Sequence, residues 1–177
     1  MAEAKYIPRL KSLYDQSIRE KLTQQFSYTN GLQVPALDKV VINMGVGEAV
    51  ADKKVVEAAA GDLAKITGQK PIMLKAKKAV AQFRVREGMP SAFMVTLRRD
   101  RMWGFLDRLI NLAIPRIKDF RGVSDKSFDR GGSWAMGLTE QAVWPEINMA
   151  NVNFSHGMHV NIVFENSDPK MSRFVLA

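Results

Sequence analysis

The sequence predicts an α+β fold, in which a mainly antiparallel sheet is covered on one face by helices. Three stretches place apolar residues three or four positions apart, which is typical of amphipathic helices. Between them lie short stretches that are β-branched or that alternate between apolar and polar residues, which is typical of strands. The 177 residues show no internal repeat, heptad series or clear linker, so we expect a single domain over residues 1–177.

The first helix is predicted at the start of the chain. Its apolar face consists of Ile7, Leu10, Leu13, Tyr14, Ile18, Leu22 and Phe26. We expect it to stop within residues 28–31, where Asn30-Gly31 is a strong turn signal. The next segment, Lys39–Met44, is short and rich in β-branched side chains, which predicts a strand.

A second helix is predicted after this strand, with Asp52 near its start and Gly68 just past its end. Its apolar face consists of Val55, Val56, Ala59, Ala60, Leu63 and Ile66. Two extended segments follow, over about residues 71–83 and 91–98. The loop Arg84–Pro90 separates them, and we expect a basic loop over about residues 75–90 to project from the domain.

In the second extended segment, Ala92, Met94 and Thr96 should face one way and Phe93, Val95 and Leu97 the other. A third helix is predicted from about Asp100 until Pro115, which should end or kink it. Residues 121–137 are rich in glycine and serine and predict a long loop that enters a strand near 133–138. The alternating residues 158–164 predict another strand, with a polar tail after it.

Several classes of protein are excluded or left without support. The chain has no cysteine, so disulfides, thiolate nucleophiles and Cys-ligated metals are absent. No apolar run approaches the roughly 18 residues of a membrane span, and we expect neither a secretory signal nor a location outside the cytoplasm. After Gly45 and Gly47, Val50 stands where a dinucleotide-binding fingerprint needs its third glycine.

Two further patterns fall short of a catalytic or metal site. Gly131-Gly132-Ser133 resembles a nucleophile elbow, but Ala135 replaces its second glycine. His156 and His159 are the only histidines, and they have no obvious third metal ligand. The sequence therefore gives no positive indication of catalysis, of a cofactor or of a metal.

Charge is concentrated in one stretch of the chain. The formal net charge is +8, and nearly all of the excess lies in residues 70–101. The basic residues of this stretch are Lys70, Lys75, Lys77, Lys78, Arg84, Arg86, Arg98, Arg99 and Arg101, against only Glu87 and Asp100. Such an excess indicates a polyanionic partner, although a solvated basic face is the simpler alternative.

Neutral donors lie near the ends of the predicted strands, at Asn43, Gln69 and Thr96. Amide and hydroxyl groups suit contacts with phosphate, ribose or base edges. No run of aromatic residues forms a stacking platform on adjacent strands. The pattern favours recognition of folded RNA over reading of an extended single strand.

A series of short motifs then points to a known family. They occur in order, as Asn43–Ala49, Ile66–Pro71, Lys75–Lys78, Gly88–Pro90, Val95–Arg99, Met102–Trp103, Pro115–Gly122, Ser127–Asp129 and Pro145–Ile147. On these motifs the chain resembles the bacterial large-subunit ribosomal proteins that bind 5S ribosomal RNA, number five in the large-subunit nomenclature.

The resemblance implies a non-catalytic RNA-binding protein of the central protuberance of the ribosome. Its implied partners are 5S rRNA, large-subunit rRNA, P-site tRNA, neighbouring 5S-binding ribosomal proteins and a small-subunit ribosomal protein across an intersubunit bridge. The residues that it assigns to rRNA are Asn43, Gln69, Thr96, Arg98, Lys39 and Lys70. The residues that it assigns to the tRNA elbow are Lys77, Lys78, Gln82, Arg84 and Arg86. The bridge is expected roughly within residues 110–147.

Two features depart from the family pattern. Where the family reads Phe-Asp-Gly-Arg-Gly-Asn-Tyr, this chain has Phe128-Asp129-Arg130-Gly131-Gly132-Ser133-Trp134. After Ser167 the family's helix and closing aromatic–basic run are not evident, which leaves the polar tail as the expectation. Two other functions stay open: an enzyme that uses His156, His159 and a carboxylate, and a general RNA-binding module outside the ribosome.

Overall fold

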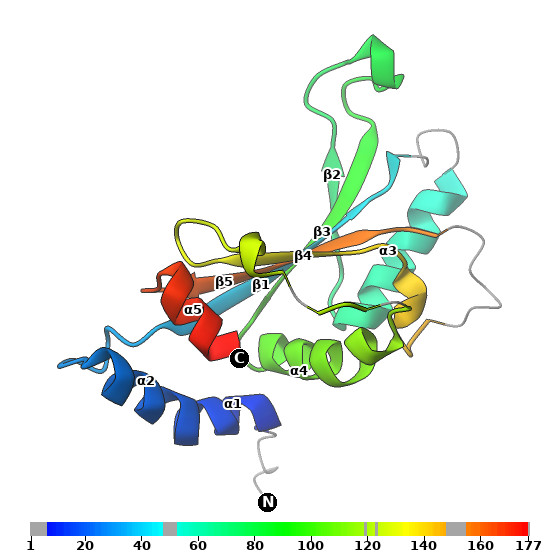
Figure 1. Ribbon diagram of the computed structural model, residues 1–177. Coiled ribbons are helices and arrows are strands. Elements are labelled where there is room, and N and C mark those ends of the chain that lie inside the picture. The colour runs from blue at the N-terminus through cyan, green and yellow to red at the C-terminus, as the bar shows by residue number, and fades with distance from the viewer. Residues whose placement is uncertain (1–6, 48–52, 119, 123, 148–154, 177) are drawn as a thin grey trace, which may run out of the picture. The chain divides into compact units, whose positions relative to one another are not determined.

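The computed structural model describes residues 7–47, 53–118, 120–122, 124–147 and 155–176. It confirms the α+β prediction, with five strands in one antiparallel sheet of order β2-β3-β1-β5-β4 (Figure 1). The strands are β1 (Ala36–Gly45), β2 (Ile72–Lys75), β3 (Pro90–Arg98), β4 (Trp134–Leu138) and β5 (Met158–Glu165). The α-helices are α1 (Arg9–Leu13), α2 (Arg19–Phe26), α3 (Lys53–Thr67), α4 (Arg99–Arg108) and α5 (Pro169–Leu176).

The chain divides into two compact units. Unit 1 comprises Met1–Val40, Leu97–Ala135 and Asn161–Ala177, and unit 2 comprises Val41–Thr96 and Met136–Val160. The division passes through β1, β3, β4 and β5, so both units use strands of the same sheet. A single domain over residues 1–177 therefore stays a prediction, and each unit is described by itself below.

The sheet has one buried face, as the alternation of side chains predicts. In β3, Phe93, Val95 and Leu97 are buried, whereas Ala92, Met94 and Thr96 are only partly covered. The same alternation continues in its neighbour β1, where Val40, Ile42 and Met44 are buried. It recurs in β5, where Met158, Val160, Ile162 and Phe164 are buried. The intervening residues of β1 and β3 therefore form a second, more open face.

Unit 1 is built around the predicted first helix. It runs unbroken from α1 through a π-helical segment, Tyr14–Ile18, into α2, and it ends where Ser27 adopts a φ of 52°. Its buried residues Tyr14 and Leu22 form a core cluster with Val34. Partly buried hydrophobic side chains pack against this cluster: Ile18, Phe26, Tyr28, Trp103, Phe174 and Val175.

The third predicted helix also lies in unit 1. It comprises α4, a π-helical segment (Leu109–Ala113) and a 3-10 turn (Ile114–Arg116). Pro115 stands in the first positions of that turn, and the helix ends there, as predicted.

In unit 2, α3 confirms the second predicted helix and ends at Gly68, which has a φ of 65°. Its predicted apolar face is buried at Val55, Val56, Ala59, Leu63 and Ile66. Asp52, expected near its start, lies outside the described residues. No helix in the part of the chain that the structure describes is long and apolar enough to cross a membrane.

Two predictions about local structure are wrong. The first extended segment was expected to continue to residue 83, but β2 ends at Lys75, and Ala81–Phe83 forms a 3-10 turn. The pairing of β2 with β3 shifts register between Leu74 and Lys75, and regular strand pairing ends at that point. The polar tail is also wrong, because Pro169–Leu176 forms α5. Pro169 fits the first turn of a helix, and eight residues are too few to show a clear periodicity in sequence.

Candidate nucleic-acid interface

Three polar side chains of unit 2 form the group that we call the polar face: Asn43, Gln69 and Thr96. Asn43 lies on β1 and Thr96 on the neighbouring β3, each between two buried residues. Because the side chains of a strand alternate, both project from the open face of the sheet. Gln69 follows α3, and its Nε2 donates to the carbonyl oxygen of Thr96 over 3.4 Å. The structure thus brings Gln69 into contact with Thr96, and the sequence did not predict this contact.

Asn43 carries the clearest chemical signal in the polar face. Its Oδ1 is buried, yet it accepts no hydrogen bond from any described residue. An unsatisfied buried acceptor costs about 1–3 kcal/mol. A ligand that supplies an N–H or O–H donor would remove this cost, and a ribose 2′-hydroxyl or a base amino group is such a donor.

Thr67 holds Gln69 in place, and sequence reasoning missed it. Thr67 is only 4% exposed, and its Oγ1 donates to the carbonyl oxygen of Leu63 at 2.7 Å. The same Oγ1 accepts from the backbone N–H of Gln69 at 3.3 Å. Gly68, with its positive φ, turns the chain between them. The signal in the sequence was the Thr-Gly pair directly after an apolar helix face.

The three cations assigned to rRNA lie in different settings. Lys70 is exposed, directly after Gln69 in unit 2. Arg98 is exposed at the end of β3, where unit 1 continues the strand, and it precedes α4. Lys39 lies on β1 in unit 1, and its Nζ is 3.2 Å from Oδ2 of Asp38. A partly exposed pair of this kind is worth little, so it does not prevent Lys39 from meeting a phosphate.

Residues 76–89, which we call the basic loop, connect β2 to β3 and project beyond both strands (Figure 1). At its base, Ala76 donates to Met89 at 2.8 Å and accepts from Gly88 at 2.9 Å through backbone groups. Nearer its tip, Val80 and Val85 form an isolated antiparallel bridge around the 3-10 turn. The loop is therefore held by backbone hydrogen bonds at two levels.

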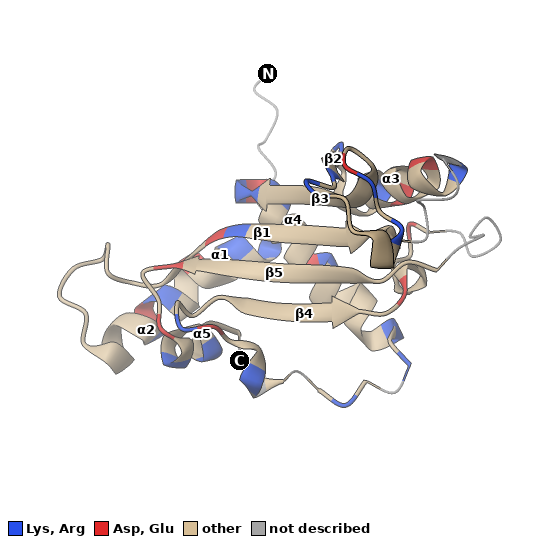
Figure 2. Ribbon diagram, turned by 90° about the horizontal axis from the view of Figure 1, so that it is seen from above, with Lys and Arg blue, Asp and Glu red and all other residues tan. Residues whose placement is uncertain are grey.

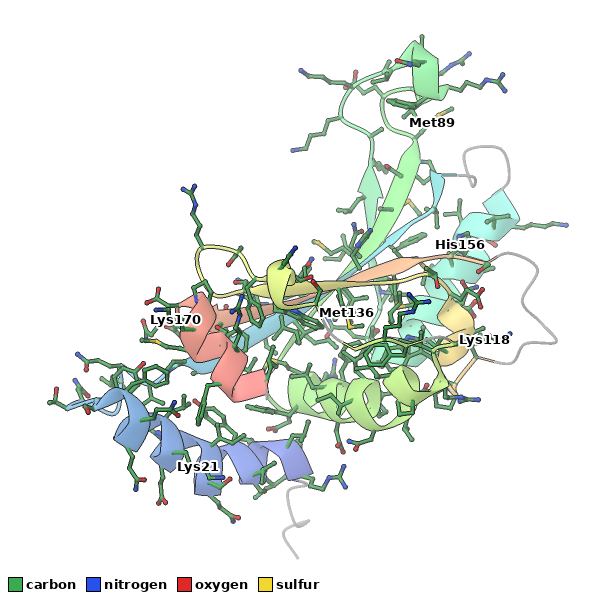
Figure 3. All side chains as sticks on the ribbon, viewed as in Figure 1. Lys21, Met89, Lys118, Met136, His156 and Lys170 are labelled. Atoms are coloured by element: carbon green, nitrogen blue, oxygen red, sulfur yellow. The ribbon has the colours of Figure 1, made fainter. Side chains whose placement is uncertain are left out.

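All five side chains assigned to tRNA lie on the basic loop and are exposed: Lys77, Lys78, Gln82, Arg84 and Arg86. None of the four cations forms an ion pair within the described ranges. Blue marks the Lys and Arg positions along this loop in Figure 2, and long nitrogen-tipped side chains project from it above Met89 in Figure 3. Exposed cations of this kind attract a polyanion, and no acidic group of the described protein neutralises them.

Phe83, at the tip of the basic loop, is a second residue that sequence reasoning missed. Its side chain is 71% exposed, and Arg84 beside it adopts a φ of 54°. An aromatic ring among cations is the kind of surface on which a nucleobase stacks. Its signal in the sequence was weak, because a single aromatic residue is no stacking platform.

The candidates for catalysis, His156, His159 and Ser133, are divided between the two units. His156 is buried, and its backbone N–H donates to Oε1 of Gln141, whereas His159 is exposed on β5. The described residues contain no group of three or more His, Asp or Glu side chains that could hold a metal ion. Ser133 lies in a hairpin that leads into β4, whereas a nucleophile elbow joins a strand to a helix.

Comparison with known protein families accounts for most of the chain from residue 30 onward. Residues 30–86 match the family described as Ribosomal protein L5, and residues 90–177 match the C-terminus of the same ribosomal family. The chain belongs to the ribosomal L5 family. As an L5 family member it is a structural constituent of the large ribosomal subunit, where it binds rRNA, and its place is the ribosome in the cytoplasm. This confirms the family that the sequence motifs indicated.

The two L5 matches meet at the basic loop. The first ends at Arg86 and the second begins at Pro90, the first residue of β3. Asn43 and Gln69 of the polar face lie in the first match, and Thr96 lies in the second. The polar face therefore draws on both parts of the L5 family pattern.

Proposed function

We propose that this L5 family member binds 5S rRNA through the polar face, with Arg98, Lys39 and Lys70 as supporting phosphate contacts. The observation that carries the proposal is the buried Oδ1 of Asn43, which has no protein partner among the described residues. Asn43 projects from the open face of the sheet, on the strand next to Thr96, whose backbone the amide of Gln69 contacts. Bound RNA would supply the missing donor and add further acceptors for amide and hydroxyl groups.

The chemistry of this face suits a folded RNA. Amide and hydroxyl groups on a sheet can contact ribose hydroxyls and the edges of bases that a loop presents. The open-face residues of β3 are Ala92, Met94 and Thr96, and none of them is aromatic. The face therefore lacks the stacked rings with which many modules hold single strands.

The basic loop serves a second RNA in this proposal, the elbow of the tRNA in the peptidyl site. Its cations lie on a hairpin that projects beyond β2 and β3 (Figure 1), in the same unit as the polar face and held by backbone hydrogen bonds. Contacts from Arg and Lys to phosphates fix position and do not read sequence. That suits a surface that must meet every tRNA alike.

The remaining contacts belong to the same proposal. The protein helps to form the central protuberance beside other 5S-binding proteins, and residues of the stretch 110–147 bridge to a small-subunit protein. It acts without catalysis, cofactor or metal. These roles rest on the family resemblance, and the structure adds a basic, exposed hairpin at Arg130 within that stretch.

A general RNA-binding module is the alternative, and a binding competition separates the two. The affinity of the protein is measured for 5S rRNA and for an unrelated RNA duplex of equal length, over a series of salt concentrations. We expect 5S rRNA to bind at least about a thousandfold more tightly at physiological salt, because specific contacts add to the phosphate contribution. Equal affinities with equal salt dependence would favour the general module.

A further inference from the structure

Within unit 1, residues 128–134 form a closed hairpin, which we call the bridge hairpin. Phe128 and Trp134 pair as an antiparallel bridge, and their ring centroids are 6.5 Å apart. Asp129 donates its backbone N–H to the carbonyl of Ser133 at 2.9 Å and accepts the N–H of Ser133 on Oδ1 at 2.8 Å. These bonds close the turn and leave Arg130 exposed at its tip.

The bridge hairpin lies directly against the first turn of α5. A Cβ added to Gly132 would meet Oγ of Ser172 at 2.7 Å and the backbone of Asp168 at 3.0 Å. Gly132 also has a φ of 75°, a conformation that favours glycine. The neighbouring Gly131 has no such contact, since its added Cβ would meet only Oδ1 of Asp129, at 3.6 Å. The close approach is therefore specific to Gly132.

Side chains of α5 complete this contact. Ser172 is fully buried, and its Oγ is 2.7 Å from Oγ of Ser167. Arg173 places its guanidinium over the ring of Phe128, 5.5 Å from the centroid. The helix thus holds the hairpin at Gly132, through backbone and a buried hydroxyl, and at Phe128, through a cation–π contact.

The opposite side of α5 is anchored to the end of the first helix. The ring of Phe174 meets that of Phe26 edge-on at 6.2 Å, and the hydroxyl of Tyr28 donates to Sδ of Met171 at 2.8 Å. Because α5 is fixed on this side, it can resist displacement by the hairpin on the other (Figure 3, with Lys170 labelled on α5).

We infer that α5 is a positioning element, which holds the bridge hairpin in the conformation that presents Arg130 to a partner. Ser172 and Arg173 are its positioning residues, and they act through Gly132 and Phe128. The inference rests on the proposed function in one respect, since the partner is the small-subunit protein of the proposed bridge.

The test replaces Ser172 by valine, which puts branched bulk where Gly132 leaves no room. Lys170→Val is the matched control, because it places the same side chain at an exposed position of the same helix. Hydrogen exchange is measured at the amides of Gly132 and Ser133, whose bonds to Asp129 report on the hairpin. We expect about tenfold faster exchange in Ser172→Val and about parental exchange in Lys170→Val. Parental exchange in a folded Ser172→Val protein would overturn the inference.

Arg173→Gln provides the second variant, since it removes the cation–π contact from an exposed side chain and leaves the helix core intact. We expect about threefold faster exchange at the same amides, with Arg173→Lys in between. If Ser172→Val does not fold, Arg173→Gln becomes the test of the inference. Parental exchange at the same amides in Arg173→Gln would then overturn it.

A subunit-joining assay separates the inference from the proposed function. It measures how tightly large subunits that carry each variant associate with small subunits. Weaker joining together with faster exchange supports both. Faster exchange with unchanged joining supports the positioning role and contradicts the bridge. Weaker joining with unchanged exchange overturns the positioning role.

Discussion

At the scale of single residues, two buried polar groups show opposite outcomes. The hydroxyl of Tyr14, a side chain only 8% exposed, donates to the carbonyl oxygen of Pro35, so its polar atom is satisfied within unit 1. The Oδ1 of Asn43 is also buried but accepts no hydrogen bond from the described part of the protein. A satisfied group stabilises the fold, whereas an unsatisfied one stores a cost that a ligand can remove.

The first prediction concerns Tyr14. Burial raises the pKa of its hydroxyl above the ordinary value, which the nearby Arg19 only partly offsets. Its stabilising contribution is therefore complete below the ordinary tyrosine pKa and is lost as the pH rises through the higher folded value. We expect Tyr14→Phe to lower the free energy of unfolding by about 1 kcal/mol at neutral pH. Above about pH 10 the parent should lose more stability than the variant, as urea unfolding would measure.

If the two proteins lost stability in parallel over that range, Tyr14 would not be the titrating group. The lysines also titrate there, and because they are common to both proteins, the comparison isolates the tyrosine.

At the scale of elements, the sequence was informative wherever a long apolar face had to be buried. Three helices and the alternation of β3 were predicted for this reason, because their periodicity is set by the core. The end of β2 at Lys75 was not predictable, because it depends on a register shift against β3, a contact between segments distant in sequence. Helix α5 was not predicted, because its apolar residues are covered by contacts with Phe26 and Tyr28, which are distant in sequence. Such contacts leave no pattern within the eight residues of α5 itself.

The second prediction treats the basic loop as an element with its own partner. We expect Arg84→Ala with Arg86→Ala to leave the affinity for 5S rRNA within a factor of about three, which is under 1 kcal/mol. Retention of tRNA in the peptidyl site of reconstituted ribosomes should fall, and the difference from the parent should shrink at raised salt, because the lost phosphate contacts are the salt-dependent ones.

A charge-matched control is Lys21→Ala with Lys170→Ala, two exposed cations on helices of unit 1. This pair should leave tRNA retention unchanged. A large loss of 5S rRNA affinity in the arginine pair, with normal tRNA retention, would contradict the separation of the two roles.

At the scale of the whole molecule, the sequence predicted the basic character of the binding surface and the protein family. It did not predict how the residues of the site are arranged. The concentration of basic residues in 70–101 predicted a polyanionic partner, and the L5 family match is consistent with it. Asn43, Gln69 and Thr96 were singled out as neutral donors, but the bond from Gln69 to Thr96 and the hidden Oδ1 of Asn43 needed the fold. Thr67 was not predicted as a site residue, because its hydroxyl is bonded within the protein, where it stabilises the turn before Gln69.

The central claim is that the polar face binds 5S rRNA, and Thr96→Ala tests it most directly. This substitution removes the hydroxyl but keeps the backbone carbonyl that Gln69 contacts, so the fold of unit 2 should persist. Thr139→Ala is the matched control, at an exposed position of the same unit. The measurement is the dissociation constant for 5S rRNA, with thermal unfolding recorded for both variants. We expect Thr96→Ala to weaken binding by about 1–3 kcal/mol and Thr139→Ala to leave it unchanged. A folded Thr96→Ala protein that binds 5S rRNA as tightly as the parent would contradict the account.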